Sequence, residues 1–411
     1  MSGGERVRPV MAHLVRALAV GVVTVLVVLG TGTATRAAPR PTAPAASSAP
    51  AASSAAAAAS TPVASPAAPG CPDRPPATPD QTPVLAHFYI WFNASSWNRA
   101  KVDYPAVGRY SSGQVSVMRR QVAQAKAAGI GGFIVSWKST DMLNSRLAAL
   151  RSVASDADFK LAITYQALDF NRNPLPAAQV RDDLVKLADT YADDPVFRVL
   201  GDKPVVAISG TWRYSLDELR SIIEPVASRL TVLATERNPA DYERVASAVA
   251  GDLYYWSSAD PETTPRYSDK LFKMADVVRR HCGIWVAPVT PGFDARLIGG
   301  HSVVARRNGA TLRRSWEAAL ATVPDMIGVI SWNEWSENTY LEPSVKFGTR
   351  ELDVLADLTG APPAPAGELD SSAPPSPGSP AQAALVAVAV VGSLVAVTVL
   401  GVRRRHRPEK P

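Results

Sequence analysis

Two carboxylates and two indole rings occur together in one short segment of the chain. Residues 331–343 read Ser-Trp-Asn-Glu-Trp-Ser-Glu-Asn-Thr-Tyr-Leu-Glu-Pro and place Glu334 and Glu337 three residues apart. In an extended strand this spacing points the two side chains to opposite faces, whereas a turn that leaves a strand can bring both together. Two convergent carboxylates can protonate a leaving oxygen and activate a nucleophile, which is the chemistry of glycosidic-bond cleavage. The alternative is a solvated loop with two surface charges, but the flanking Trp332 and Trp335 favour a pocket.

Other aromatic and polar side chains follow apolar segments elsewhere in the chain. Aromatic rings suit the C–H faces of sugars, while hydroxyl, amide and amino groups bind sugar hydroxyls. A single aromatic residue is weak evidence because it can equally belong to the core, and we expect core positions for Phe88 and Phe92. We expect sugar contacts from His87, Tyr89, Trp91, Trp137, Lys138, Tyr254, Tyr255, Asn333, Trp335 and Tyr340.

The sequence lacks the motifs of several other chemistries. The domain holds three histidines, His87, His281 and His301, with no His-x-x-x-His or Cys-x-x-Cys spacing, so we expect no metal site. No Gly-x-Ser-x-Gly elbow, P-loop or dinucleotide fingerprint is present, so we expect no cofactor. Asn93-Ala-Ser95 fits a glycosylation sequon, which is a frequent chance pattern.

The elements that must position these residues alternate regularly. Short apolar runs typical of buried parallel strands occur at 84–92, 131–137, 160–165, 204–209, 230–235, 252–256, 283–288 and 327–332. Helical patterns occupy 115–128, 142–155, 177–191, 216–227, 240–250, 267–281, 310–322 and 349–358, with Ser215 as an expected N-cap. Eight such units predict an α/β fold with a single (β/α)₈ TIM barrel over 82–360, whose active site lies at the carboxyl ends of the strands. A doubly wound open sheet is the alternative, which the lack of a Gly-rich loop after the first strand disfavours.

The two ends of the chain are predicted to lie outside this domain. Residues 1–38 have the basic, apolar and small-residue layout of a signal peptide, or of an uncleaved anchor. Residues 39–81 form an Ala/Pro/Ser-rich linker that we expect to be disordered, and 361–382 form a Pro-rich stalk. Residues 383–402 are an apolar run that predicts a transmembrane helix, and the basic tail 403–411 would then stay in the cytoplasm. We therefore expect a cell-membrane protein with a single span and an extracellular domain.

The distribution of charge excludes nucleic acid as a partner. Of the net charge of +6, the first 38 residues carry +3 and the last nine carry +4, which leaves −1 for the rest. Phosphate binding needs basic residues gathered on a folded face. Two cysteines, Cys71 and Cys282, can form a disulfide in an exported protein or remain as unpaired thiols.

Six segments in order resemble glycoside hydrolase family 99, the endo-α-mannosidase and endo-α-mannanase family, and its family-99-like relatives. They are His87-Phe-Tyr-Ile-Trp91, Tyr104-Pro-Ala-Val-Gly-Arg-Tyr-Ser-Ser112, Ala128-Gly-Ile-Gly-Gly-Phe-Ile-Val-Ser-Trp137, Gly251-Asp-Leu-Tyr-Tyr-Trp256, Pro288-Val-Thr-Pro-Gly-Phe-Asp294 and Asn333-Glu-Trp-Ser-Glu337. The resemblance implies a barrel that cleaves α-mannosidic links with retention and without a metal. The sugar's own 2-hydroxyl would attack the anomeric carbon, with Glu334 as its base and Glu337 as acid and then base. It also implies that Tyr89, Trp137 and Tyr255 line sugar subsites, and it adds Tyr104 to the substrate-binding set.

The chain also departs from the family pattern. The family reads Asn-Glu-Trp-His-Glu-Gly-Thr-Gln-Ile-Glu, whereas this chain has Ser336, Asn338 and Tyr340 at the His, Gly and Gln positions. Both carboxylates remain, so the sequence predicts a hydrolase that acts on a polysaccharide or oligosaccharide. We expect it to be membrane-anchored and monomeric. A non-catalytic surface glycan-binding protein and a sugar transferase of surface-polysaccharide biosynthesis are the alternatives.

Overall fold

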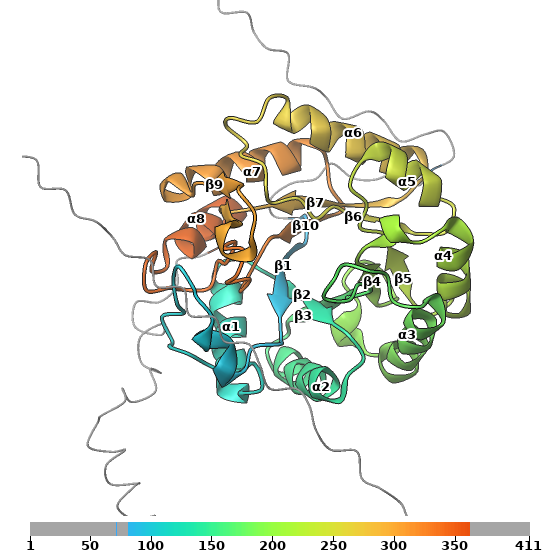
Figure 1. Cartoon of the computed structure of the whole chain (residues 1–411), viewed down its shortest axis with the longest axis horizontal. Coiled ribbons are helices and arrows are strands. Elements are labelled where there is room, and N and C mark those ends of the chain that lie inside the picture. The colour runs from blue at the N-terminus through green and yellow to red at the C-terminus, as the bar shows by residue number, and fades with distance from the viewer. Residues whose placement is uncertain (1–70, 72–80, 362–411) are drawn as a thin grey trace, which may run out of the picture. The chain divides into compact units, whose positions relative to one another are not determined.

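A computed structural model describes Cys71 and residues 81–361, and in it eight parallel strands form one sheet. Their order in the sheet is β5-β4-β3-β2-β1-β10-β7-β6, and every neighbouring pair is parallel. The strands are β1 (Val84–Tyr89), β2 (Gly132–Trp137), β3 (Lys160–Tyr165), β4 (Val205–Ile208), β5 (Thr231–Leu233), β6 (Gly251–Leu253), β7 (Ile284–Val289) and β10 (Met326–Val329). The predicted (β/α)₈ barrel is therefore confirmed, and Figure 1 shows its helices around the strands.

The helices follow the strands as the periodicity predicts. They are α1 (Val115–Ala127), α2 (Asp141–Asp156), α3 (Ala177–Tyr191), α4 (Leu216–Ile223), α5 (Pro239–Val245), α6 (Tyr267–Arg280), α7 (Ala310–Ala321) and α8 (Arg350–Thr359). Ser215 caps α4 as expected, because its hydroxyl accepts from the Glu218 amide, and the Glu218 carboxylate accepts from the Ser215 amide. Short 3₁₀ turns occupy Ala94–Asn98, Pro195–Phe197, Thr211–Arg213, Glu224–Val226, Arg296–Ile298 and Arg307–Gly309.

Alternation along the strands divides the apolar side chains between two cores. On β1, Ala86 and Phe88 point outward and join the large core between the barrel and its helices. Leu85 points inward and packs with inward residues of the other strands, including Ile134 and Leu253. Because successive side chains of a strand point to opposite faces, every residue near the mouth is assigned to the inside or the outside by its parity.

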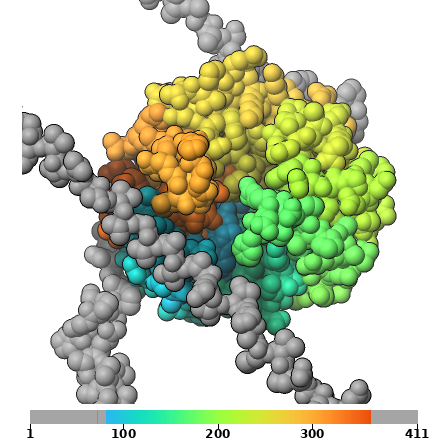
Figure 2. All heavy atoms as spheres, in the orientation of Figure 1, coloured from blue at the N-terminus to red at the C-terminus, as the bar shows by residue number. Residues whose placement is uncertain are grey.

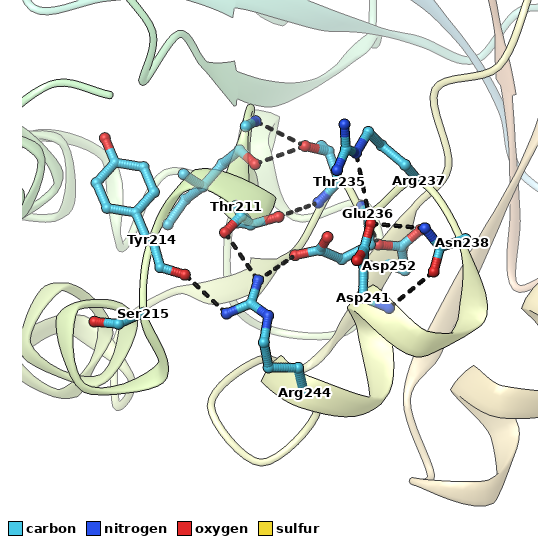
Figure 3. A network of polar contacts seen from close by, with 12 residues as sticks. Thr211, Tyr214, Ser215, Thr235, Glu236, Arg237, Asn238, Asp241, Arg244 and Asp252 are labelled. Carbon is cyan, nitrogen blue, oxygen red and sulfur yellow. Dashed lines mark hydrogen bonds and ion pairs between the residues drawn. The ribbon is translucent and has the colours of Figure 1, made fainter. Parts of the chain in front are cut away.

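The barrel closes at a short seam between β5 and β6. Beyond the main sheet, Ala234 bridges Asp252, and the Ala234 amide donates to the Gly251 carbonyl at 2.9 Å. Buried polar groups brace this seam, as Figure 3 shows: the amide of Glu236 donates to Asp252 Oδ1 at 2.7 Å, and Arg244 lies 3.8 Å from the Glu236 carboxylate. Burial raises the pKa of both carboxyl groups, that of Asp252 most strongly.

Cys71 and Cys282 form a disulfide across 211 residues of sequence, which resolves the two alternatives left open above. A two-stranded hairpin, β8 (Phe293–Asp294) and β9 (Val303–Val304), follows β7 and was not predicted. Within Cys71 and 81–361, none of the helices is long and apolar enough to cross a membrane. The predicted signal peptide, most of the linker, the stalk, the span at 383–402 and the tail lie outside the described residues.

Candidate active site

Two tyrosines reach the mouth of the barrel, one from the end of β1 and one from the residues that follow β6. Tyr89 ends β1 on the inward-pointing parity of Leu85, and Tyr255 follows β6 on the inward parity of Leu253. Their hydroxyl oxygens lie 2.8 Å apart. Figure 2 shows this face hollowed near its middle, where the blue N-terminal strand region lies deeper than the orange and green segments around it.

Glu334 and Glu337 converge on these tyrosines, as predicted from the turn. The turn after β10 is set by the Ser331 hydroxyl, which accepts from the Glu334 amide at 2.8 Å. The carboxylate of Glu334 in turn accepts from the Ser336 amide at 2.9 Å. The negative charges of both carboxylates act on Tyr89 and Tyr255 and raise the pKa of each hydroxyl, after the larger effect of burial.

Burial sets the protonation of the carboxylate pair. Burial, followed by the nearby charge of Glu337, raises the pKa of Glu334 to about 7, although the bonds from Ser336 act to lower it. Burial also raises the pKa of Glu337. A pair of this kind shares protons, and perturbed carboxyl groups at a barrel mouth are typical of acid–base catalysis.

Two cations beside the pair were missed by the sequence interpretation. The charge of Lys101, from the loop after β1, lowers the pKa of Glu334, and the charge of Arg172, from the loop after β3, lowers that of Glu337. Neither cation has a carboxylate within 4.0 Å among the described residues. Their loops carry no motif, so the sequence holds no signal for them beyond the expectation that βα loops meet at the mouth.

Asn333 is fully buried, so the expectation that it binds a sugar hydroxyl is corrected. Its Oδ1 accepts from the Tyr89 amide at 2.8 Å, and its Nδ2 donates to the Tyr89 carbonyl at 3.0 Å. The side chain is 0% exposed and its Nδ2 also donates to the Tyr110 hydroxyl, so it offers no surface to a ligand. Asn333 instead joins the catalytic turn to the end of β1.

Trp335 and Tyr340 also lie behind the site, and this too corrects the prediction. Both side chains are 1% exposed, and their rings stack on each other with centroids 3.9 Å apart. Trp335 donates from Nε1 to Glu342 at 3.1 Å, and Tyr340 donates to Asp103 at 2.7 Å. They support the turn that carries Glu334 and Glu337.

Trp137 and Tyr254 point out of the barrel, so their predicted sugar contacts are wrong. Trp137 is 3% exposed and donates from Nε1 to Asn144 of α2 at 2.9 Å. Tyr254 is 3% exposed and packs beside Trp285 in the core under the helices. The parity of each strand predicts this, because Ile134 and Leu253 define which residues face inward.

The remaining predicted residues lie in three kinds of place. His87 points inward below the tyrosines, with its ring 4.9 Å from that of Tyr255, and burial lowers its pKa to about 3, so it stays neutral. Trp91 is 37% exposed beside Tyr89 and is free to contact a ligand. Tyr104 is half-buried under Arg109, and half-buried Lys138 donates to the Leu168 carbonyl at 3.1 Å.

Comparison with known protein families identifies the domain. Glycosyl hydrolase family 99 matches residues 93–359, which is more than half of the chain and the whole barrel beyond β1. The chain belongs to glycosyl hydrolase family 99. It is therefore a glycoside hydrolase, in agreement with the resemblance found in its motifs.

The curated relatives of this family 99 protein include proteins named as mannosidases and a mutanase. The chain is 22% identical over 267 residues to the glycoprotein endo-alpha-1,2-mannosidase of Rattus norvegicus, covering 59% of this chain and 56% of the relative. It is 39% identical over 250 residues to a mutanase of Penicillium rubens, covering 58% of this chain and 52% of the relative. The chain thus spans about half the length of the curated relatives it matches.

A solved structure of the same family has the same fold. The endo-alpha-mannosidase of Bacteroides thetaiotaomicron superposes with a TM-score of 0.58 at 20% identity, over 67% of this chain and 95% of that one. Among the described residues of this family 99 domain, no group of three or more His, Cys, Asp or Glu side chains could hold a metal ion.

Proposed function

We propose that the barrel cleaves α-mannosidic or closely related linkages in a polysaccharide or oligosaccharide, with retention, through Glu334 and Glu337. The observation that carries this proposal is the pair of carboxylates on one turn at the barrel mouth, buried Glu334 and half-buried Glu337, both with raised pKa. The mannosidase names of the relatives support the sugar, and the mutanase makes a glucan the closest competitor.

In the first step the substrate supplies its own nucleophile. Glu334 takes the proton from the 2-hydroxyl, and O2 forms a bond to the anomeric carbon as the bond to the leaving oxygen breaks. Glu337 gives its proton to that leaving oxygen, so one proton enters the enzyme and one leaves it. In the second step water attacks the anomeric carbon as the bond between that carbon and O2 breaks; Glu337 accepts the water's proton, and Glu334 returns its proton to O2.

Burial prepares this division of roles. The negative charge of Glu337 disfavours ionisation of Glu334 in a site sheltered from water. The productive form of the proposed mechanism carries the proton on Glu337. Lys101 favours the ionised form of Glu334, as its role as base requires.

The ends of the chain support an extracellular location. The predicted signal peptide and the apolar run at 383–402 would tether the barrel to the outer face of the cell membrane, where it would meet polysaccharides as a monomer. The Cys71–Cys282 disulfide supports this proposal, because disulfides persist in oxidising compartments.

A hydrolysis panel tests the activity. The purified full chain is incubated with α-mannans, α-manno-oligosaccharides and mutan, and products are followed by chromatography, with the anomer formed first identified by proton NMR. We expect release of products from a mannan with the α-anomer appearing first. Glycan binding without hydrolysis of any substrate would contradict the proposal and favour the binding protein, and the β-anomer would contradict retention.

A further inference from the structure

Glu342 is a buried carboxylate that no step of the proposed hydrolysis uses. It is 3% exposed and belongs to the Tyr-Leu-Glu-Pro sequence that follows the catalytic turn. Its Oε1 accepts from Gln121 Nε2 at 2.6 Å. Its Oε2 accepts from the Tyr110 hydroxyl at 2.8 Å and from Trp335 Nε1 at 3.1 Å.

The chemistry of these neighbours fixes the direction of each bond. The indole N–H of Trp335 can only donate. Asn333 Nδ2 donates to the Tyr110 hydroxyl at 3.2 Å, so that hydroxyl must donate its own hydrogen to Glu342. Glu342 therefore receives three hydrogen bonds, which favour its ionised form.

No cation shares this site with Glu342. Among the described residues, no Lys, Arg or His nitrogen lies within 4.0 Å of its carboxylate. Its pKa is raised to about 7, because burial raises it more than the three donors lower it. The carboxylate thus depends on three neutral donors, and each donor depends on it, because a buried donor without an acceptor is costly.

Two of the donors lead directly to the catalytic residues. Trp335 lies between Glu334 and Glu337 in the chain, and its single polar atom is the one held by Glu342. Tyr110 connects Glu342 to Asn333, which binds both backbone groups of Tyr89. Gln121 anchors the arrangement to α1.

We propose that Glu342 is a positioning residue for the reaction, because its carboxylate oxygens fix Trp335 between the catalytic glutamates and, through Tyr110, Asn333 beside Tyr89. Its kinetic test rests on the proposed function. A second test measures how well ordered the catalytic turn is and needs no activity. Catalytic groups must be held close to the productive geometry, and a misplacement of about 1 Å can lower the rate about 100-fold.

The two informative substitutions are Glu342→Gln and Glu342→Leu. The amide of Glu342→Gln can accept from Tyr110 and Trp335, and Gln121 can turn its own amide to accept from the new N–H, so all bonds remain. Glu342→Leu leaves the donors without an acceptor. We expect kcat to stay within about 3-fold for Glu342→Gln and to fall at least about 30-fold for Glu342→Leu, with KM changed little because ground-state binding is retained.

Asp183 provides a matched control for the loss of a buried carboxylate. It is 6% exposed on α3 and accepts from the Tyr165 hydroxyl at 2.8 Å, with no bond to the catalytic turn. Asp183→Leu is expected to lower stability and leave kcat unchanged. Tyr110→Phe keeps the ring and breaks only the link from Glu342 to Asn333, so it tests that branch if Glu342→Leu does not fold.

Hydrogen exchange measures the positioning without catalysis. We expect faster amide exchange over 331–344 in Glu342→Leu, and unchanged exchange there in Glu342→Gln and Asp183→Leu. An unchanged kcat together with unchanged exchange in Glu342→Leu would overturn the positioning role. Wild type that hydrolyses no glycan would overturn the proposed function instead, and the exchange result would still decide the role of Glu342.

Discussion

The hydroxyl oxygens of Tyr89 and Tyr255 lie 2.8 Å apart, with the charges of Glu334 and Glu337 acting on both. Because the pKa of each hydroxyl is raised, both tyrosines stay neutral. One hydroxyl donates to the other, so the pair retains a single hydrogen for a third group.

The first prediction concerns the pH dependence of kcat/KM, which reports the free enzyme. As the base, Glu334 must be ionised, and its pKa of about 7 places the acidic limb near neutral pH. Lys101 lowers that pKa, so Lys101→Met is expected to move the acidic limb to higher pH. Lys203→Met is the control, since Lys203 is bound to the Ala227 carbonyl away from the carboxylates. A limb that stays in place in Lys101→Met would contradict the electrostatic assignment.

A second prediction separates two tryptophans that look alike in the sequence. Trp91 is exposed at the mouth, so Trp91→Ala is expected to raise KM about 10-fold, through loss of ring stacking, without loss of stability. Trp137→Phe loses the bond to Asn144 and should lower the free energy of unfolding by about 1–2 kcal/mol, with KM unchanged. Steady-state kinetics and urea unfolding check both. A raised KM in Trp137→Phe would place that ring at the substrate.

These two tryptophans show how far the sequence could predict the site. The eight strand–helix units were predictable because buried parallel strands and amphipathic helices have different periods. Glu334 and Glu337 were predictable because acidic residues between indoles stand out. Trp137 and Tyr254 were misplaced although strand parity could have excluded them.

Other parts of the site carried no readable signal. Lys101 and Arg172 belong to irregular loops whose paths depend on tertiary packing. The bonds of Glu342 join residues up to 232 positions apart, and no local pattern predicts such contacts. The hairpin of β8 and β9 is two residues long on each side, too short for strand periodicity to register.

The third prediction is that ionisation of Glu334 lowers the free energy of unfolding. The pKa of Glu334 rises from 4.5 to about 7 on folding, so its contribution to stability is complete below about pH 4.5 and is lost as the pH rises through 7. Glu334→Gln removes this loss of stability, because an amide does not ionise. The variant is expected to exceed wild type by about 3 kcal/mol in free energy of unfolding at pH 8, and by much less at pH 5. Urea unfolding at the two pH values checks this, and equal differences at both would contradict it.

The fourth prediction concerns the disulfide. Cys71 and Cys282 close a loop of 211 residues, which restricts the unfolded chain. Replacing Cys282 with Ala is expected to lower the free energy of unfolding by about 3–5 kcal/mol, without changing kcat. Cys71→Ser is the matched variant, because it breaks the same bond outside the barrel and should cost a similar amount. A large loss in Cys282→Ala alone would show that its effect is local packing.

The most direct measurement is the turnover of wild type, Glu334→Gln and Glu337→Gln on a hydrolysed glycan, with thermal unfolding recorded for each. Both variants keep the size of the side chain and remove its ability to exchange a proton. The account predicts that each folds and loses at least about 100-fold in kcat, as expected for loss of a general acid or base. Turnover within about 3-fold of wild type in either folded variant would contradict the assignment of that carboxylate.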